Sequence, residues 1–492
     1  MKKISLLTLF AAMAFHFASA SDFVVDGIDY GIYSADEKTL YVTWSSGSYS
    51  GDIVIPSTVE IDGQTWTVTA VGDFAFMQSD KLTSVQLPAT IERLGTAAFA
   101  YSSTLTSINI PDGVRYIGDG CFNNCSGLIR LDFPARLDYL GAGAMAYTSV
   151  ISAKLPSGLK EVPSQLFEEC RALSSVEIPE GVTAIGFQAF QNTFALTSVV
   201  LPSTLETIGN NCFAFSGLES LHLPVNFRSY GDNAITYLSS LKRYTVDPDN
   251  EWFTSVDGVL YSKDMKTLNS FPLNCGKTDY TVSEATDSIG SYAFYGTSMT
   301  SVTLPEGLRA IGKSAFAVAE SLKSVTVPGK VETIDSYGFF GCSALTDLSL
   351  GASLKSIGSS AFAYITALES VTSLNPEPPA GAVFTNEVYA SATLNVPYSS
   401  VDAYAKADGW SGFKTVKGLG DSGVDLIASD GVEILVRNGA VDIECGVGIP
   451  VEIYGLDGKK VFSSSGSCKA MLTSGRAYIV RVGIEARKVM VR

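Results

Sequence analysis

Few residues in this chain are spaced for catalysis. His222 is the one histidine after residue 20. A Ser-His-Asp triad or a histidine metal site needs organised polar neighbours, which the sequence around His222 does not provide. The segment Val246–Asn250 (VDPDN) carries the carboxylates of a calcium loop but has neither the glycine nor the distal glutamate of an EF-hand. We therefore predict no enzyme activity, no metal site and no cofactor.

Charged side chains on a repeating surface are the better candidates for function. Aligned on the repeat described below, six residues fall on one exposed face of short strands. We predict that these six contact a protein partner: Arg130, Asp132, Lys154, Glu177, His222 and Arg243.

A repeat of 22 or 23 residues positions these side chains. Its general form is I-G-x-x-A-F-x-x-(small)-x-x-L-x-S-V-x-L-P-x-x-V/L-x-x. Self-similarity at this period indicates a solenoid, in which each repeat forms one turn. The twelve repeats begin at Val71, Leu94, Ile117, Leu140, Val162, Ile185, Ile208, Tyr230, Ile289, Ile311, Ile334 and Ile357.

The positions within a repeat predict its local structure. Apolar residues at positions 15 and 17 alternate with polar ones at 14 and 16, which indicates a half-buried strand, and proline at position 18 ends it. We expect the glycine at position 2 to adopt a positive φ at a tight corner. The pair Ala98-Phe99 and its equivalents predict a column of buried phenylalanine rings.

Six of the eight cysteines precede residue 420, and the repeat accounts for most of these. Cys125 and Cys170 share position 9 but lie two turns, about 10 Å, apart, which is too far for a disulfide. Cys121 and Cys212 occupy the alanine position before the phenylalanine. We interpret these as buried thiols. Cys445 and Cys468 share a separate C-terminal segment, and the sequence does not decide whether they form a disulfide or remain free thiols.

Composition and turn signals divide the chain further. Residues 1–20 have the layout of a secretory signal ending in Ala18-Ser19-Ala20, so we expect a secreted or surface protein without a transmembrane segment. The net charge of −16 disfavours nucleic-acid binding. We predict these domains in order: 1–20 signal peptide, 21–66 N-terminal β cap, 67–374 solenoid with an insert at about 247–285, 375–417 closing cap, 418–431 linker, and 432–492 a small all-β sandwich-like domain.

The repeat resembles the BspA-like leucine-rich repeats of bacterial surface proteins. LTSVQLP (82–88) and IGKSAFA (311–317) carry the resemblance, which covers about residues 22–417. It implies a secreted or outer-surface protein that adheres to host extracellular-matrix or cell-surface proteins. The C-terminal segment resembles a type IX secretion sorting domain, through Val451, Ile453, Tyr454, Gly458, Val461, Leu472, Gly475, Tyr478, Val480 and Lys488.

Two other functions remain open from the sequence. The insert holds a predicted hairpin at Asp257-Gly258 and is rich in aromatic residues: Trp252, Phe253, Tyr261 and Phe271. The resemblance implies an ordinary structural insert, which we favour; the alternative is that it protrudes as a carbohydrate-active or hydrolytic module that uses an acid such as Asp249 or Asp257. Alternatively, the protein is purely structural.

Overall fold

The computed structural model describes residues 21–46, 48–419, 425–429, 432–437, 440–473, 476–483 and 485–491. The predicted signal peptide lies outside the described residues. The chain forms two compact units. One runs to Leu322 and includes Tyr337–Cys342, and the other consists of Lys323–Ser336 and the residues from Ser343 onward.

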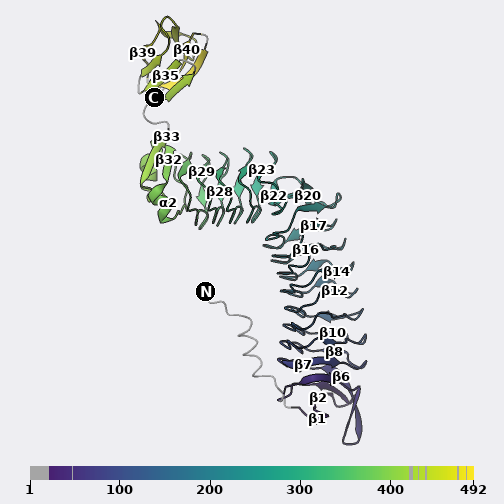
Figure 1. The fold of residues 1–492 in the computed structure, drawn as a ribbon. Helices are drawn as coiled ribbons and strands as arrows, with labels where there is room; N and C mark the ends of the chain where they lie inside the picture. Colours follow the sequence, from purple (N-terminus) through teal and green to yellow (C-terminus); the bar gives the residue numbers. More distant parts are fainter. Residues whose placement is uncertain are drawn as a thin grey trace. The chain divides into compact units, whose positions relative to one another are not determined.

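The predicted solenoid is confirmed, and each of the twelve predicted repeat starts is the last residue of a short strand. In the first unit these strands stack in parallel, one per turn, with partners one repeat apart, such as Ile117 and Leu140 (Figure 1). We call this face the short-strand side. Its strands are β6 (Gln64–Val71), β8 (Arg93–Leu94), β10 (Tyr116–Ile117), β11 (Tyr139–Leu140), β13 (Glu161–Val162), β15 (Ala184–Ile185), β16 (Thr207–Ile208) and β18 (Ser229–Tyr230).

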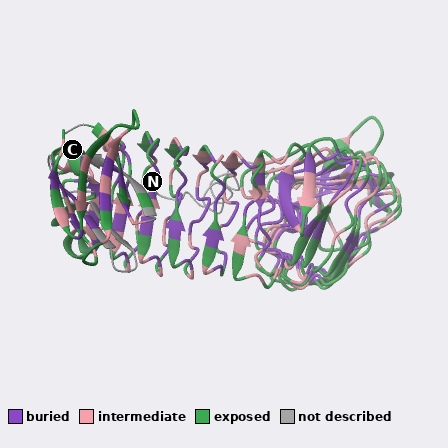
Figure 2. Ribbon diagram, turned by 90° about the horizontal axis from the view of Figure 1, so that it is seen from above, coloured by how far each residue is buried: buried purple, intermediate pink, exposed green. Residues whose placement is uncertain are grey.

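A second parallel ladder forms what we call the strand side, at positions 14–17 of each repeat. Its residues alternate between exposed and buried, as the sequence predicts, and Figure 2 colours the ribbon by burial. The strands here are β7 (Lys81–Gln86), β9 (Ser107–Ile108), β12 (Ser152–Lys154), β14 (Ser175–Glu177), β17 (Ser220–Leu223) and β19 (Arg243–Val246).

The N-terminal segment pairs with both ladders at the first turn. β1 (Phe23–Val25), β2 (Ile28–Ser34) and β3 (Thr39–Val42) form an antiparallel meander whose last strand pairs with β6. β5 (Thr58–Ile61) also pairs with β6, and β4 (Ser50–Val54) pairs with β7. Backbone groups that the first turn would otherwise leave unpaired are therefore satisfied on both sides.

Phenylalanine rings fill the inside of the turns, as predicted. Phe99 is fully buried, and its ring centroid lies 5.0 Å from that of Phe76 and 5.3 Å from that of Phe122. The same stacking continues through Phe167, Phe190 and Phe213. Met145 and Ile235 take the phenylalanine position in two turns and are equally buried. Buried apolar side chains therefore fill this position in each of these turns, although Met145 and Ile235 are not aromatic.

The expectation of a positive φ at the position-2 glycine is wrong. Gly118 has no positive φ, whereas positions 4 and 8 have one in turn after turn, as at Gln188 and Asn192. Glycine occurs at position 2 because the preceding turn approaches too closely for a side chain. A Cβ on Gly118 would lie 2.5 Å from the backbone nitrogen of Thr96.

Positions 3–8 form a third face, which we call the bend side. Here the backbone N–H groups at positions 4, 6 and 8 point along the solenoid and donate to carbonyl groups of the next turn. For example, Ala97 donates to Asp119 (N···O 2.8 Å) and Tyr101 donates to Asn123 (2.7 Å). The residues at positions 4 and 8 have a left-handed backbone, and their N–H groups are among these donors. The backbone hydrogen bonds between turns are therefore formed here without a regular strand.

Both ladders of the first unit are interrupted near the middle. On the short-strand side, pairing stops between β11 and β13, where Pro163 replaces the usual glycine at position 2. On the strand side, residues 130–132 keep the exposed–buried–exposed alternation but form no strand between β9 and β12. Regular pairing of the turns is therefore lost on two faces within the same region of the chain.

The predicted insert hairpin is confirmed: β20 (Phe253–Val256) pairs antiparallel with β21 (Val259–Ser262) around Asp257-Gly258. β22 (Thr267–Ser270) follows and pairs in parallel with β24 (Ser288–Ile289), so the insert is incorporated into the short-strand side. The next turns of this unit contain β23 (Asp279–Thr281), β25 (Ser301–Thr303) and β26 (Ala310–Ile311).

In the second unit the turns continue and then close. β29 (Asp347–Leu350) pairs in parallel with both β27 (Ser324–Thr326) and β31 (Ser370–Ser373). On the short-strand side, β28 (Thr333–Ile334) pairs with β30 (Ser356–Ile357). The closing segment adds α2 (Asn386–Ser391), β32 (Thr393–Pro397), the 3₁₀ turn η1 (Tyr398–Ser400), α3 (Val401–Tyr404) and β33 (Thr415–Leu419).

The C-terminal region consists of two four-stranded antiparallel sheets. In spatial order one sheet is β34 (Asp425–Ser429), β35 (Val432–Arg437), β36 (Ala440–Glu444), β39 (Cys468–Met471). The other is β38 (Lys460–Ser465), β37 (Pro450–Gly455), β40 (Arg476–Val482), β41 (Glu485–Val491).

Ile443, Val451 and Val480 belong to one buried apolar core in this region. The first sheet begins earlier than the predicted start at residue 432, because Asp425–Ser429 pairs antiparallel with β35. Cys445 and Cys468 are free thiols.

Candidate functional site

All six predicted contact residues lie on the strand side, and all are exposed. They fall at positions 14 and 16, on either side of a buried apolar residue such as Ala153 or Val176. The strand geometry turns alternate side chains outward, so the repeat itself presents them to solvent.

Four of the six form two ion pairs. Arg130 and Asp132 are paired within one turn, with Nη2···Oδ2 at 3.0 Å. Lys154 and Glu177 are paired across neighbouring turns, with Nζ···Oε2 at 2.8 Å. The hydrogen bond and charge of Glu177 raise the pKa of Lys154 above its usual value. Both pairs are open to water, so an approaching charged partner can replace either contact.

His222 and Arg243 lie farther along the same side, on β17 and β19. The Nδ1 atom of His222 is 3.1 Å from Oγ1 of Thr245 in the next turn. The structure does not bring either residue to the ion pairs described above. Among the described residues, no group of three His, Cys, Asp or Glu side chains could hold a metal ion.

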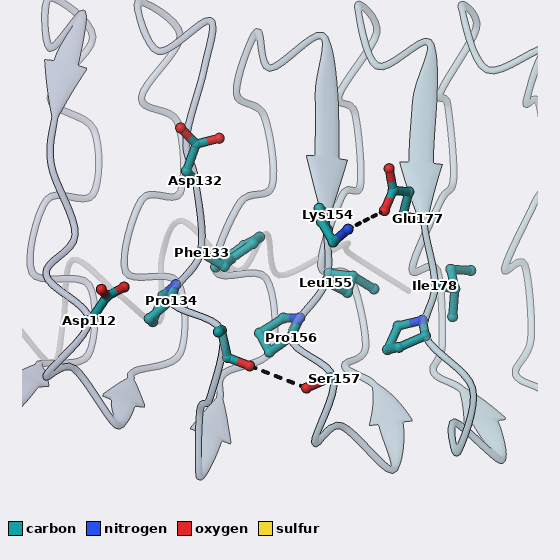
Figure 3. A pocket seen from close by; sticks show the side chains of 12 residues that line it. Asp112, Asp132, Phe133, Pro134, Lys154, Leu155, Pro156, Ser157, Glu177 and Ile178 are labelled. Atoms are coloured by element: carbon teal, nitrogen blue, oxygen red, sulfur yellow. Dashed lines mark hydrogen bonds and ion pairs between the residues drawn. The ribbon is translucent and has the colours of Figure 1, made fainter.

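A groove crosses four turns beside the ion pairs (Figure 3). Its volume is about 560 Å³. One edge carries Asp132, Lys154 and Glu177, and most of the rest consists of apolar side chains followed by prolines, together with Asp112, Ala135 and Ser157. We call this surface the strand-side groove, lined by Asp112, Asp132, Phe133, Pro134, Ala135, Lys154, Leu155, Pro156, Ser157, Glu177, Ile178 and Pro179.

The apolar part of this groove was not predicted. Phe133, Leu155 and Ile178 occupy position 17, which the repeat pattern assigns to the interior. Phe133 and Ile178 are only half-buried, whereas Leu155 between them is buried. The sequence signal was present in the phenylalanine at Phe133, where most turns have leucine, isoleucine or valine.

The insert is not a protruding aromatic element. Phe253, Tyr261 and Phe271 are buried, and only Trp252 of the four aromatics is exposed. The insert is therefore structural, and the protruding alternative is not realised, because Phe253, Tyr261 and Phe271 pack into the solenoid instead of away from it. Asp249 and Asp257 are exposed.

The calcium-like segment 246–250 has a structural role instead. Asn250 is fully buried, and its Nδ2 donates to the carbonyl oxygens of Pro224 and Phe227, each at 2.8 Å. Its Oδ1 accepts the backbone N–H groups of Trp252 and Phe253. This one side chain fastens the beginning of the insert to the preceding turn.

Comparison with known families identifies the repeat. The BspA-type leucine-rich repeat region matches residues 57–174, 140–256 and 265–377, well over half of the chain. The chain belongs to the BspA-type leucine-rich repeat family. No protein of curated function matches it.

Two solved structures share the fold of this BspA-type protein. A leucine-rich cell surface protein from Faecalibacterium prausnitzii is 24% identical, with a TM-score of 0.54 over 72% of this chain and 95% of its own. A leucine-rich repeat protein from Bacteroides ovatus is also 24% identical, with a TM-score of 0.52 over 71% of this chain and 94% of its own. The first of these two is a cell surface protein. Within the described residues of the present chain, no helix is long and apolar enough to cross a membrane.

Proposed function

We propose that this BspA-type protein recognises a protein partner outside the bacterial cell through the strand-side groove. The observation that carries the proposal is the combination of three charged and three apolar side chains along three consecutive turns (Figure 3). Repeat solenoids commonly bind extended partners on surfaces of this kind.

The chemistry of the groove favours an extended peptide segment with both charge and apolar side chains. Lys154 offers a cation between two carboxylates, Asp132 and Glu177. A partner carboxylate that replaces Glu177 would keep Lys154 paired. Phe133 and Ile178 are half-exposed, so covering them would remove apolar surface from water. Because the charges are solvent-exposed, salt should weaken the association.

A binding comparison tests this proposal. The protein from residue 21 onward would be immobilised and probed with a panel of purified extracellular-matrix proteins. We expect the variant Arg130→Ala/Asp132→Ala/Lys154→Ala to lose at least about tenfold in affinity for the partner that the unmodified protein captures, since charged pairs at interfaces are commonly worth this much or more.

The matched control is Glu332→Ala/Lys355→Ala, which removes another solvent-accessible ion pair, of 2.6 Å, at position 22 of the repeats. It should bind as the unmodified protein does. Equal binding by the groove variant and this control would refute the assignment of the groove. Capture of no matrix protein would refute the adhesive role.

We also propose that the C-terminal region directs export. Two antiparallel sheets around an apolar core support an independent module, and its sequence resembles a type IX secretion sorting domain. Removing residues 432–492 should leave the protein inside the cell envelope of a bacterium that has this system. Unchanged appearance in the medium or on the cell surface would refute the role.

A further inference from the structure

The first unit contains a second hollow, on the bend side, away from the groove. Its volume is about 580 Å³. We call it the bend-side hollow, lined by Ala97, Ala100, Tyr101, Asp119, Gly120, Asn123, Asn124, Ala142, Gly143, Ala146, Tyr147, Gln165 and Glu168. No residue of the strand-side groove contributes to it.

The hollow exists because three consecutive turns carry small residues at the same repeat positions. Position 4 holds Ala97, Gly120 and Gly143 in these turns, whereas the next two turns hold Gln165 and Gln188. All five have the same left-handed backbone, with φ between 50° and 61°. The hollow therefore results from small side chains on a backbone conformation that the neighbouring turns share.

Two tyrosines at position 8 line the hollow. Tyr101 and Tyr147 belong to turns two apart, and the shorter Asn124 lies between them in the intervening turn. Turns spaced by about 4.8 Å place the two tyrosine backbones about 10 Å apart. A gap of this size admits one saturated six-membered ring at contact distances of about 3.5–4.0 Å on either side. Tyr147 is 41% exposed, so its ring is open to a ligand.

The polar groups around these rings are amides and carboxylates. Gln165 Nε2 donates to Glu168 Oε2 at 2.7 Å, and Asn124 Nδ2 donates to Asn123 Oδ1 at 2.6 Å. Such groups can both donate to and accept from hydroxyl groups. No lysine, arginine or histidine lines this hollow. Burial raises the pKa of Glu168 above its usual value. An anionic ligand would therefore be unfavourable, and a neutral polyol would be well matched.

A peptide is a poorer match for this surface. The backbone N–H groups at positions 4, 6 and 8 already donate to the next turn, as Phe99 does to Cys121 at 2.8 Å. An extended chain would therefore find no strand edge with which to pair. A second, smaller hollow of about 340 Å³ shares Asn124 and Tyr147 with the first and continues toward Glu169 and Arg171. The space thus suits more than one ring.

We propose that the bend-side hollow binds a neutral oligosaccharide. One sugar ring lies between Tyr101 and Tyr147, and Asn124, Gln165 and Glu168 hydrogen-bond its hydroxyl groups. The next sugar extends past Tyr147 into the smaller hollow. This site is separate from the proposed protein-binding groove, so each can be tested without the other.

Calorimetry with the protein from residue 21 onward tests the site. The probes are neutral trisaccharides of glucose, mannose, galactose and N-acetylglucosamine, with a sulfated trisaccharide for comparison. We expect at least one neutral probe to bind and the sulfated one to bind more weakly. Tyr147→Ala should lose at least tenfold in affinity, and Tyr147→Phe should retain most of it because the ring remains.

The glutamine side chain in Gly143→Gln would fill the hollow. It requires no change of backbone conformation, because Gln165 and Gln188 have the same positive φ in neighbouring turns. It should abolish saccharide binding while leaving the circular dichroism spectrum unchanged. Tyr364→Ala, which removes an exposed position-8 aromatic outside the hollow, is the control and should bind normally. The proposal is overturned if no neutral probe binds, if the sulfated probe binds best, or if Gly143→Gln binds as the unmodified protein does.

Discussion

The glycine at position 2 gives the sharpest test of how the turns pack. A Cβ added at Gly118 would lie 2.5 Å from the backbone nitrogen of Thr96 and 2.6–2.8 Å from the carbonyl carbon and oxygen of Gly95. Ordinary contacts begin near 3.4 Å, so Gly118→Ala requires the two turns to separate by roughly 1 Å. That separation would strain the hydrogen bond from Gly118 N–H to the carbonyl of Leu94, now 2.9 Å.

The expected cost follows from these two effects. Overpacking against atoms that cannot rotate away typically costs about 1–3 kcal/mol, and weakening a buried backbone hydrogen bond adds about 1 kcal/mol. We therefore expect Gly118→Ala to lower the free energy of unfolding by about 3 kcal/mol. Urea unfolding followed by circular dichroism measures this loss, from the midpoint shift at constant slope.

Gly120, two residues later, is the matched control. It has φ of +58°, but a Cβ there would meet only Asn123 Cβ, at 3.6 Å. Ala97 already adopts this conformation one turn earlier. Gly120→Ala should therefore cost about 1 kcal/mol, the penalty of a left-handed residue. If Gly120→Ala destabilises as much as Gly118→Ala, backbone conformation and not close approach explains the repeated glycine, and the reasoning fails.

Three further predictions concern the core, the buried thiols and the groove. Phe190→Ala should lower the free energy of unfolding by about 3–5 kcal/mol, far more than the exposed Phe215→Ala, and equal midpoints in urea would contradict the ring column. Burial raises the pKa of Cys125 to about 12 and that of Cys170 to about 11, against 9.0 when unfolded. The unfolded thiols therefore ionise first, so stability should fall as pH rises from about 9 toward 12, less steeply in a variant with both cysteines changed to alanine. Lys154→Ala should leave the urea midpoint unchanged while weakening partner binding, because its ion pair is fully exposed; a large midpoint shift would make Lys154 structural.

The features of the fold that follow from the repeat period could be predicted from the sequence. The register of Phe99, Phe190 and their equivalents, the exposed positions 14 and 16, and the hairpin at Asp257-Gly258 all follow from residue spacing. Spacing of apolar and polar residues reports which side chains face inward, and in a solenoid this defines most of the fold.

The features that could not be predicted from the sequence depend on contacts between neighbouring turns. The close approach at Gly118 is a contact between residues one repeat apart, which no local pattern encodes. The sequence left a protruding insert open as an alternative, because the burial of Phe253, Tyr261 and Phe271 depends on how the insert joins the solenoid. The structural role of Asn250 was not foreseen because two of its hydrogen-bond partners, Pro224 and Phe227, lie in the preceding turn.

Departures from the repeat, and not the repeat itself, place the two candidate sites. A uniform solenoid presents the same surface at every turn and so has no preferred position for a ligand. Between the turns that begin at Leu94 and Val162, small residues open the bend side, residues 130–132 form no strand, and Pro163 replaces glycine. The strand-side groove and the bend-side hollow both lie in this region, on different faces. In this region the phenylalanine position is still filled, by the buried side chain of Met145, so the core stays regular while the surface does not. A regular core allows the surface to vary and to form binding sites without loss of the fold.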